Sequence, residues 1–179
     1  MDWMKCRRTT TRLECWDYTQ GAYYYITICT KDQHPHFGMI QDGHMHLSRM
    51  GEHAQVCLGA IHDHFSHVEI DCFVVMPNHI HAILIFDNTP SGRKTTIHGL
   101  SAISKPKGGS LGHVLSCYKA AVTKWCRENG YNEFAWQPRF YDHIIRNEKS
   151  LHLIRRYIEN NPLRWELERE SPENIGDFI

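Results

Sequence analysis

The chain alternates between short apolar runs with a two-residue period and longer stretches with the period of an amphipathic helix. Runs rich in aromatic and β-branched residues predict strands at 22–30 and 68–75. Residues 37–47 predict a β-hairpin that turns at Asp42-Gly43. Helical spacing and end signals predict three helices, at about 49–67, at 110–128, and from near 147 to just before Pro162.

The most apolar segment is 79–86, and two histidines stand at its start. Because side chains alternate along a strand, His79 and His81 lie on one face, and Ile83 and Ile85 continue their row. A strand this apolar is typical of the middle of a sheet, where both faces are buried. Two imidazoles in that setting cost free energy unless something binds them.

Strands and helices in this order predict an α+β fold, with an antiparallel sheet covered by helices on one side. The βαββαβ plan of the ferredoxin-like and RRM-like group is the nearest simple description. Its last strand is missing unless residues 140–145 supply it. A length of 179 residues without internal repeats predicts a single domain, residues 1–179.

Spacing alone does not make a metal site, because other histidine pairs share it. His62 and His64 fall in a predicted helix, where residues two apart point away from each other. The pairs at 34/36 and 44/46 fall in a loop and on a hairpin edge, where water can solvate them. His79 and His81 combine a shared face with a buried setting, so they are either metal ligands or hydrogen-bonded core histidines.

A second group of polar residues lies in the last predicted helix. Leu151, Ile154 and Ile158 form an apolar stripe along it. Tyr157 and Asn161 are four residues apart and lie on the same side, beside that stripe. They either face the histidine strand or serve as a packing tyrosine and a C-terminal cap.

The charge is distributed unevenly along a chain that is formally neutral, with 20 basic and 20 acidic residues. Segment 88–127 contains several Lys and Arg and no acidic residue, which is typical of a polyanion-binding face or of a solvated loop. Pro, Gly and Ser within 88–109 predict a long mobile loop there. Residues 166–179 predict an acidic tail.

Cysteine and hydropathy patterns indicate the compartment. The seven cysteines are scattered without a C-x-x-C pair, which predicts reduced thiols rather than disulfides or a cysteine zinc site. No apolar run is long enough to cross a bilayer, and the first residues lack the apolar core of a signal peptide. We therefore expect a cytoplasmic protein that does not act on a membrane.

Three segments together resemble the REP-associated tyrosine transposases, relatives of the single-tyrosine HUH transposases of small bacterial insertion sequences. They are Met-Pro-Asn-His-Ile-His at 76–81, the stretch from Trp136 to Asn147, and Tyr-Ile-Glu-Asn-Asn-Pro at 157–162. Segments 23–30 and 109–112 fit the same pattern, so the resemblance covers roughly residues 7–165. The conjunction of His-x-His after Met-Pro-Asn with Tyr-Ile-x-x-Asn-Pro is specific, whereas no single piece is.

The resemblance implies an HUH fold and a metal-dependent transposase that cuts and transfers single-stranded DNA. It implies that Tyr157 attacks a DNA phosphodiester to leave a 5′-phosphotyrosine and a free 3′-OH, while His79, His81 and Asn161 bind Mg²⁺ or Mn²⁺. It also implies a bacterial, nucleoid-associated protein whose substrates are the hairpins of repetitive palindromic elements. Phosphate contacts would fall to basic residues of the loop, of the second helix and of the segment after it, namely Arg93, Lys94, Lys105, Lys107, Lys119, Lys124 and Arg139.

Other interpretations stay open. Neutral net charge and an acidic tail argue against tight, salt-resistant DNA binding. The alternative is a catalytically inactive or domesticated single-stranded nucleic-acid-binding domain of the same fold. A nucleotide hydrolase of the histidine-triad kind is excluded, because position 83 is Ile where a third alternating histidine is required. The sequence is compatible with a monomer or a homodimer.

Overall fold

The computed structural model of the chain describes residues 21–87 and 109–170. The predicted basic loop, apart from Gly109, and the end of the acidic tail lie outside the described residues. The elements along the chain are β1 (Ala22–Cys29), the 3₁₀ helix η2 (Lys31–Gln33), β2 (Gly38–Gln41), β3 (His44–Leu47), α1 (Arg49–Gly59), α2 (Ile61–His64), β4 (Val68–Val75), β5 (His79–Phe86), α3 (Leu111–Glu128), β6 (Tyr141–Ile145), α4 (Glu148–Glu159) and α5 (Asn161–Glu170).

Four strands form one antiparallel sheet in the order β4-β5-β1-β6. The first and third strands of the βαββαβ plan, β1 and β5, are central, and β4 and β6 are the edges. This is the ferredoxin-like arrangement, so the predicted α+β fold is confirmed. The uncertain last strand is confirmed as well, because Tyr141–Ile145 pairs with β1.

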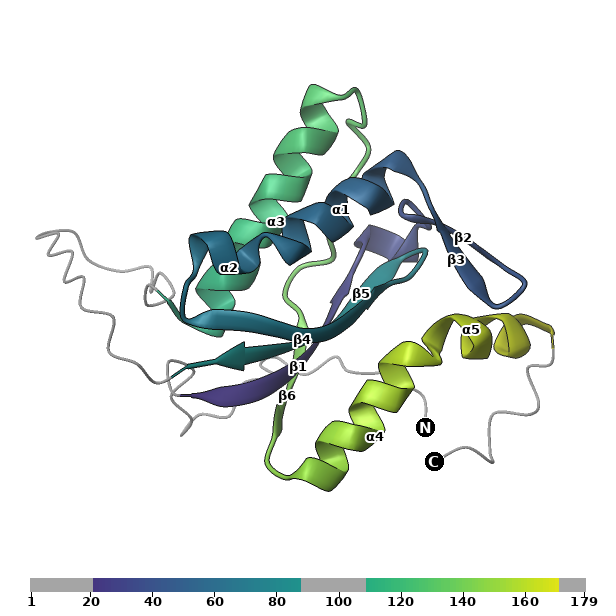
Figure 1. The fold of residues 1–179 in the computed structure, drawn as a ribbon. Coiled ribbons are helices and arrows are strands. Elements are labelled where there is room, and N and C mark those ends of the chain that lie inside the picture. The colour runs from purple at the N-terminus through teal and green to yellow at the C-terminus, as the bar shows by residue number, and fades with distance from the viewer. Residues whose placement is uncertain (1–20, 88–108, 171–179) are drawn as a thin grey trace, which may run out of the picture.

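The predicted hairpin is confirmed and stands apart from the main sheet. Strands β2 and β3 pair only with each other, in a two-stranded sheet. Asp42 and Gly43 have φ of 53° and 71°, as a two-residue hairpin turn of type I′ requires. The hairpin packs against α5 (Figure 1).

Helices cover both faces of the sheet, so the prediction that they cover one side is wrong. Helices α1, α2 and α3 lie on one face, and α4 lies on the other (Figure 1). The first face holds the main core, to which β5 contributes Ile80, Ala82 and Leu84. On the second face, Ile83 and Ile145 are buried beneath the apolar stripe of α4. Because β5 carries apolar side chains on both of its faces, helices must shield both faces of the sheet from water.

The helix predicted at 49–67 is shorter and broken. Its N-cap is confirmed, since the Gly51 N–H donates to Ser48 Oγ at 3.1 Å. Helix α1 ends at Gly59, a residue with low helix propensity, and the short α2 ends at His64 before the chain turns into β4. On α1, Val56 is 66% exposed, whereas Leu58 is fully buried in the core.

The last predicted helix corresponds to α4, and a second helix follows it directly. Helix α4 is capped by Asn147 and ends at Glu159, as predicted. A further helix, α5, starts at Asn161, where the sequence pattern predicts only the end of a helix before Pro162. Proline is equally favoured in the first turn of a new helix, because the N–H groups of that turn have no acceptor within the helix and the one that proline lacks is not needed. No helix within the described ranges is long and apolar enough to cross a membrane.

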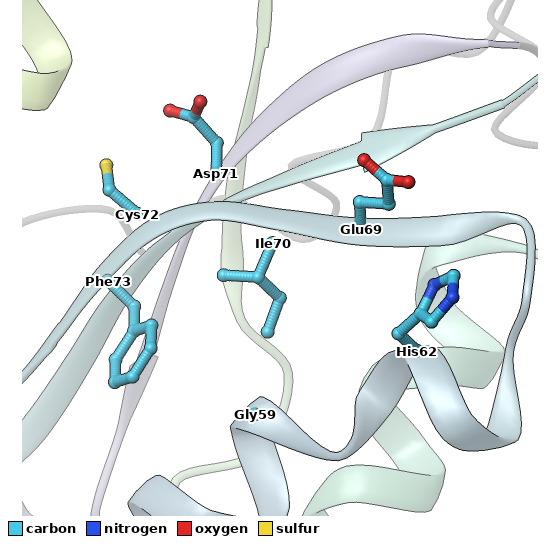
Figure 2. A pocket seen from close by; sticks show the side chains of 7 residues that line it. All are labelled: Gly59, His62, Glu69, Ile70, Asp71, Cys72 and Phe73. Carbon is cyan, nitrogen blue, oxygen red and sulfur yellow. The ribbon is translucent and has the colours of Figure 1, made fainter.

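Edge strand β4 contains a β-bulge at Asp71, where the pairing register with β5 shifts between Ile70 and Cys72. Asp71 and Cys72 are consecutive yet point to the same side of the strand, away from Ile70 and Phe73 (Figure 2). The bulge therefore turns the Asp71 carboxylate toward the face that α4 covers. There, Arg155 of α4 donates to both carboxylate oxygens, with Nε 2.7 Å from Oδ2 and Nη2 in contact with Oδ1.

Candidate active site

His79 and His81 stand side by side at the start of β5, on the face that α4 covers. Their Nε2 atoms are 3.1 Å apart, and their ring centroids are 4.5 Å apart. His81 is buried and His79 keeps a partly exposed edge. The shared face predicted from alternation is confirmed. Two ring nitrogens that converge in this way need a proton or a cation between them, because two facing lone pairs repel.

The hydrogen bonds of Asn78 determine which His79 nitrogen is bare. Asn78 Nδ2 donates to the Gln33 carbonyl at 3.1 Å, so Asn78 Oδ1 is an acceptor. His79 Nδ1 lies 2.6 Å from this oxygen and therefore donates to it. The neutral ring then has its lone pair on Nε2, which points at His81. A ring fixed through its outer nitrogen in this manner is the usual arrangement of a metal-binding histidine.

His81 is held by two hydroxyl groups that can serve either tautomer. Its Nδ1 lies 2.9 Å from Tyr25 Oη and 2.9 Å from Thr27 Oγ1. Burial raises the pKa of Tyr25 above its ordinary value, against the hydrogen bond with Thr27, and the neighbouring Tyr157 and Tyr141 raise it further. Tyr25 thus keeps its proton. Because each hydroxyl can donate or accept, His81 can carry its one proton on Nδ1, which leaves Nε2 free, without losing its Nδ1 contact.

Both histidines are neutral near pH 7. Burial lowers the pKa of His79 to about 4, and a hydrogen bond with Asn161 opposes this only in part. Burial, followed by repulsion from His79, lowers the pKa of His81 well below its ordinary value. Neutral imidazole is the form that binds metal ions, so the site is ready for a cation without a prior proton loss to solvent.

Tyr157 and Asn161 both lie at the histidine pair. The Tyr157 ring is 5.3 Å from the His81 ring and 6.3 Å from the Tyr25 ring, between centroids. Asn161 is 6% exposed and contacts the His79 ring. The prediction that one helix presents both is wrong, because Asn160 caps α4 and Asn161 opens α5. The change of helix direction, rather than a four-residue spacing, brings the two together.

Helix α5 adds two residues that the sequence did not predict for the site. Arg164 places its Cζ 5.3 Å from the centroid of the Tyr157 ring, over the ring face. Trp165 lies 5.6 Å from the His79 ring, between centroids. The signal that could have found them is Asn161-Pro162 itself, an N-cap type residue followed by a proline, which is typical of a helix start.

The basic residues proposed for DNA contact are scattered. Arg93, Lys94, Lys105 and Lys107 lie outside the described residues. The Lys119 ammonium donates to the carbonyls of Gln137 and Arg139, both at 2.8 Å, and burial lowers the pKa of Lys119 to about 8. The exposed Lys124 pairs with Glu128 at 3.8 Å on α3, the helix on the far face of the sheet. Arg139 is exposed and has φ of 69°.

The donor set at the histidine pair suits a divalent cation with open positions. In the parts of the chain that are described, no three His, Cys, Asp or Glu side chains gather at one point. Asn161, which is buried and contacts the His79 ring, could offer its carboxamide oxygen as a third protein ligand to a cation at His79 and His81. Two imidazoles and one neutral oxygen suit Mn²⁺, and Mg²⁺ less commonly, with water or substrate oxygens filling the remaining positions.

A hollow of about 650 Å³ lies elsewhere, along the β4 edge beside α1 and α2 (Figure 2). None of its lining residues belongs to the group formed by His79, His81 and Tyr157. The candidate site lies on the sheet face beside α4 and α5, where Tyr157 and Trp165 contact the histidine rings.

No family model matches the chain. A protein of Haemophilus influenzae described as uncharacterised is 38% identical over 162 residues, which cover 89% of this chain and 90% of the relative. The solved structure of a REP-associated tyrosine transposase bound to a REP hairpin superposes with a TM-score of 0.58 at 20% identity, over 86% of this chain and 73% of that one. A Deinococcus radiodurans protein described as a candidate transposase gives a TM-score of 0.46 at 15% identity, over 83% of this chain and 95% of that one. The chain therefore belongs to the same family as the Haemophilus influenzae protein, and its fold is that of the REP-associated tyrosine transposase structure.

Proposed function

We propose that this protein is a metal-dependent, single-stranded DNA endonuclease and strand transferase with Tyr157 as its nucleophile. The observation that carries the proposal is the meeting of Tyr157 with the histidine pair. Its ring lies 5.3 Å from His81, whose Nε2 is 3.1 Å from that of His79. A phenol, two neutral imidazoles and a carboxamide are the groups that a cation-assisted tyrosine transesterification needs.

The proposed reaction is an exchange of phosphodiesters. Tyr157 Oη attacks the phosphorus, the Oη–P bond forms and the P–O3′ bond breaks. The phenol proton leaves to water and the departing 3′-oxygen takes up one proton from water, so no net proton is consumed. The product is a 5′-phosphotyrosine with a free 3′-OH. The new ester retains the energy of the bond that was broken, so rejoining to another 3′-OH needs no nucleotide hydrolysis.

The residues around the nucleophile would have separate tasks. His79, His81 and Asn161 would hold Mg²⁺ or Mn²⁺, which supplies charge withdrawal from the non-bridging phosphate oxygens. Tyr25 and Thr27 orient His81 through Nδ1, and Asn78 orients His79 through the same ring position. Burial keeps both imidazoles neutral over the physiological pH range.

Hairpin DNA is the substrate class that the fold supports best. The structure with the shared fold is bound to a REP hairpin, and here the partly exposed His79 can be reached by a nucleic acid strand. We extend this substrate to the present chain, with the exposed Arg139 and the basic segment at 93–107 as phosphate contacts. In this view the protein acts in bacteria on DNA in the cytoplasm.

The test is to capture DNA covalently from a library of single-stranded hairpins with randomised flanks, in the presence of Mn²⁺ or Mg²⁺. Sequencing of the DNA retained after denaturation gives the hairpin and the position of attack. We expect an adduct that requires the metal and disappears in Tyr157→Phe. The matched control is Tyr23→Phe, since Tyr23 belongs to the same apolar cluster.

Two results would contradict the proposal. One is an adduct that persists in Tyr157→Phe, which would place the nucleophile elsewhere. The other is hairpin binding without any adduct under either metal, which would identify the chain as a binding domain of the same fold.

A further inference from the structure

Helix α5 places a guanidinium beside the proposed nucleophile. Arg164 Cζ lies over the face of the Tyr157 ring, 5.3 Å from its centroid. Both side chains are half-buried, and Tyr157 itself borders His81 at 5.3 Å. A cation over an aromatic face is attracted by the ring and holds it in place. The same guanidinium is thereby held beside the side chain that a scissile phosphate must approach.

The position of Arg164 is set by contacts on both sides of it. Its own N–H donates to the Asn160 carbonyl at 3.0 Å, at the joint between α4 and α5. Three residues earlier, Asn161 is buried against His79. Two residues later, Glu166 Oε2 accepts the Gly43 N–H at the tip of the β2–β3 hairpin. Helix α5 is therefore held on both sides of Arg164, at Asn161 and at Glu166.

We propose that Arg164 is a further catalytic residue, which contacts the non-bridging oxygens of the scissile phosphate and stabilises the charge that develops there during attack by Tyr157. The inference rests on the function proposed above. Guanidinium is the side chain best suited to this task, because its planar fork can donate two parallel hydrogen bonds to a phosphate. Its charge does not depend on pH in the range where the enzyme would work. The bonds made and broken are those given for Tyr157, and Arg164 transfers no proton.

The competing explanation is that Arg164 only packs on Tyr157. A packing role predicts that any loss of activity follows a loss of stability, and that the chemistry of the phosphate makes no difference. A catalytic role predicts that the loss depends on the charge of one phosphate. The two explanations are separated by replacing the scissile phosphate alone.

The experiment uses the hairpin captured by the wild-type chain, with its scissile phosphate natural or replaced by a neutral methylphosphonate. Wild type, Arg164→Gln, Arg164→Lys and the control Arg156→Gln are compared; Arg156 is the exposed arginine that precedes Tyr157. We expect adduct formation on natural DNA to fall about 100-fold in Arg164→Gln and about 10-fold in Arg164→Lys. Arg156→Gln should retain the wild-type rate.

The affinity for each hairpin, measured in the Tyr157→Phe background, distinguishes a phosphate contact from a packing role. There, Arg164→Gln should weaken binding to the natural hairpin about 10-fold and leave binding to the methylphosphonate hairpin unchanged. Thermal unfolding of each variant shows whether folding is intact. Equal loss on both hairpins, or a wild-type adduct rate in Arg164→Gln, would overturn the inference and leave the proposed function standing. Absence of an adduct in the wild type would overturn both.

Discussion

Arg155 of α4 forms a two-point ion pair with Asp71, the extra residue of the bulge in β4. The pair joins the helix that carries Tyr157 to an edge strand of the same chain. Since Tyr157 is two residues beyond Arg155, the bulge sets where the phenol lies relative to the histidines.

We expect Asp71→Asn and Arg155→Gln each to slow adduct formation several-fold by loosening α4. The double variant should be no slower than either single variant, because both changes remove the same contact. Adduct rates and amide exchange in α4 measure the effect, with the exposed Asp63→Asn as control. Additive losses in the double variant would show that the two residues act separately.

Mn²⁺ binding in the absence of DNA tests the ligand set. His81→Ala should abolish binding, and Asn161→Ala should weaken it by about 10- to 100-fold, since the remaining imidazoles still chelate. His46→Ala, on the exposed hairpin strand, is the matched control. Calorimetric titration measures affinity and circular dichroism confirms folding. Unchanged binding in His81→Ala would locate the cation elsewhere.

Acid should destabilise the fold through the histidine pair. Both rings have a lowered pKa in the folded state, so the unfolded chain binds more protons as the pH falls. For His79, stability is lost between its ordinary pKa of 6.5 and its folded pKa of about 4. The loss is about 3 kcal/mol when it is complete, at about 1.4 kcal/mol per pKa unit. Urea unfolding across this range should show a shallower pH dependence in His79→Gln; equal slopes would contradict the assignment.

A single chain should contain the whole site. Because Asp71 holds α4 on its own sheet, we expect mixtures of the His81→Ala and Tyr157→Phe proteins to form no adduct. The measurement is covalent capture over a range of protein concentrations, with a His81→Ala and Tyr157→Phe double variant mixed with wild type as control. Recovery of activity in the mixture would show that the tyrosine helix passes between subunits.

The acidic tail is expected to oppose DNA binding. Removing the whole tail after Trp165 would not test this alone, because it would also remove Glu166, which accepts the Gly43 N–H. Neutralising Glu168, Glu170, Glu173 and Asp177 retains that contact. Affinity for single-stranded hairpins at low salt should rise several-fold, as repulsion of the phosphates is removed. An unchanged affinity would show that the tail does not compete with DNA.

Alternation and turn chemistry predicted most of the sheet and half of the site. The two-residue period placed His79 and His81 on one face, and Asp42-Gly43 predicted the hairpin. The bulge at Asp71 was not predictable, because it is a property of pairing with β5 rather than of the local residues. It determines how α4 is anchored, so the position of Tyr157 could not be derived from periodicity.

The helix end predicted before Pro162 is confirmed, but the start of α5 at Asn161 was not predicted, and this had the larger effect on the site. Proline ends one helix and begins another equally well, and only tertiary contacts decide between the two. Here Asn161 is buried against His79 and Glu166 meets the hairpin, so a new helix is stabilised. Arg164 and Trp165 were missed because their helix was missed.

The single residue Asn160 joins α4 to α5, and this joint has a consequence for comparing genomes. Adding or removing one residue there would change both the direction and the rotation of α5 relative to α4. Asn161 and Arg164 would then leave the site together, while the sheet and its main core stayed intact. Among distant homologues, an unbroken spacing from Tyr157 to Arg164 should thus distinguish cutting from non-cutting proteins better than overall sequence identity does.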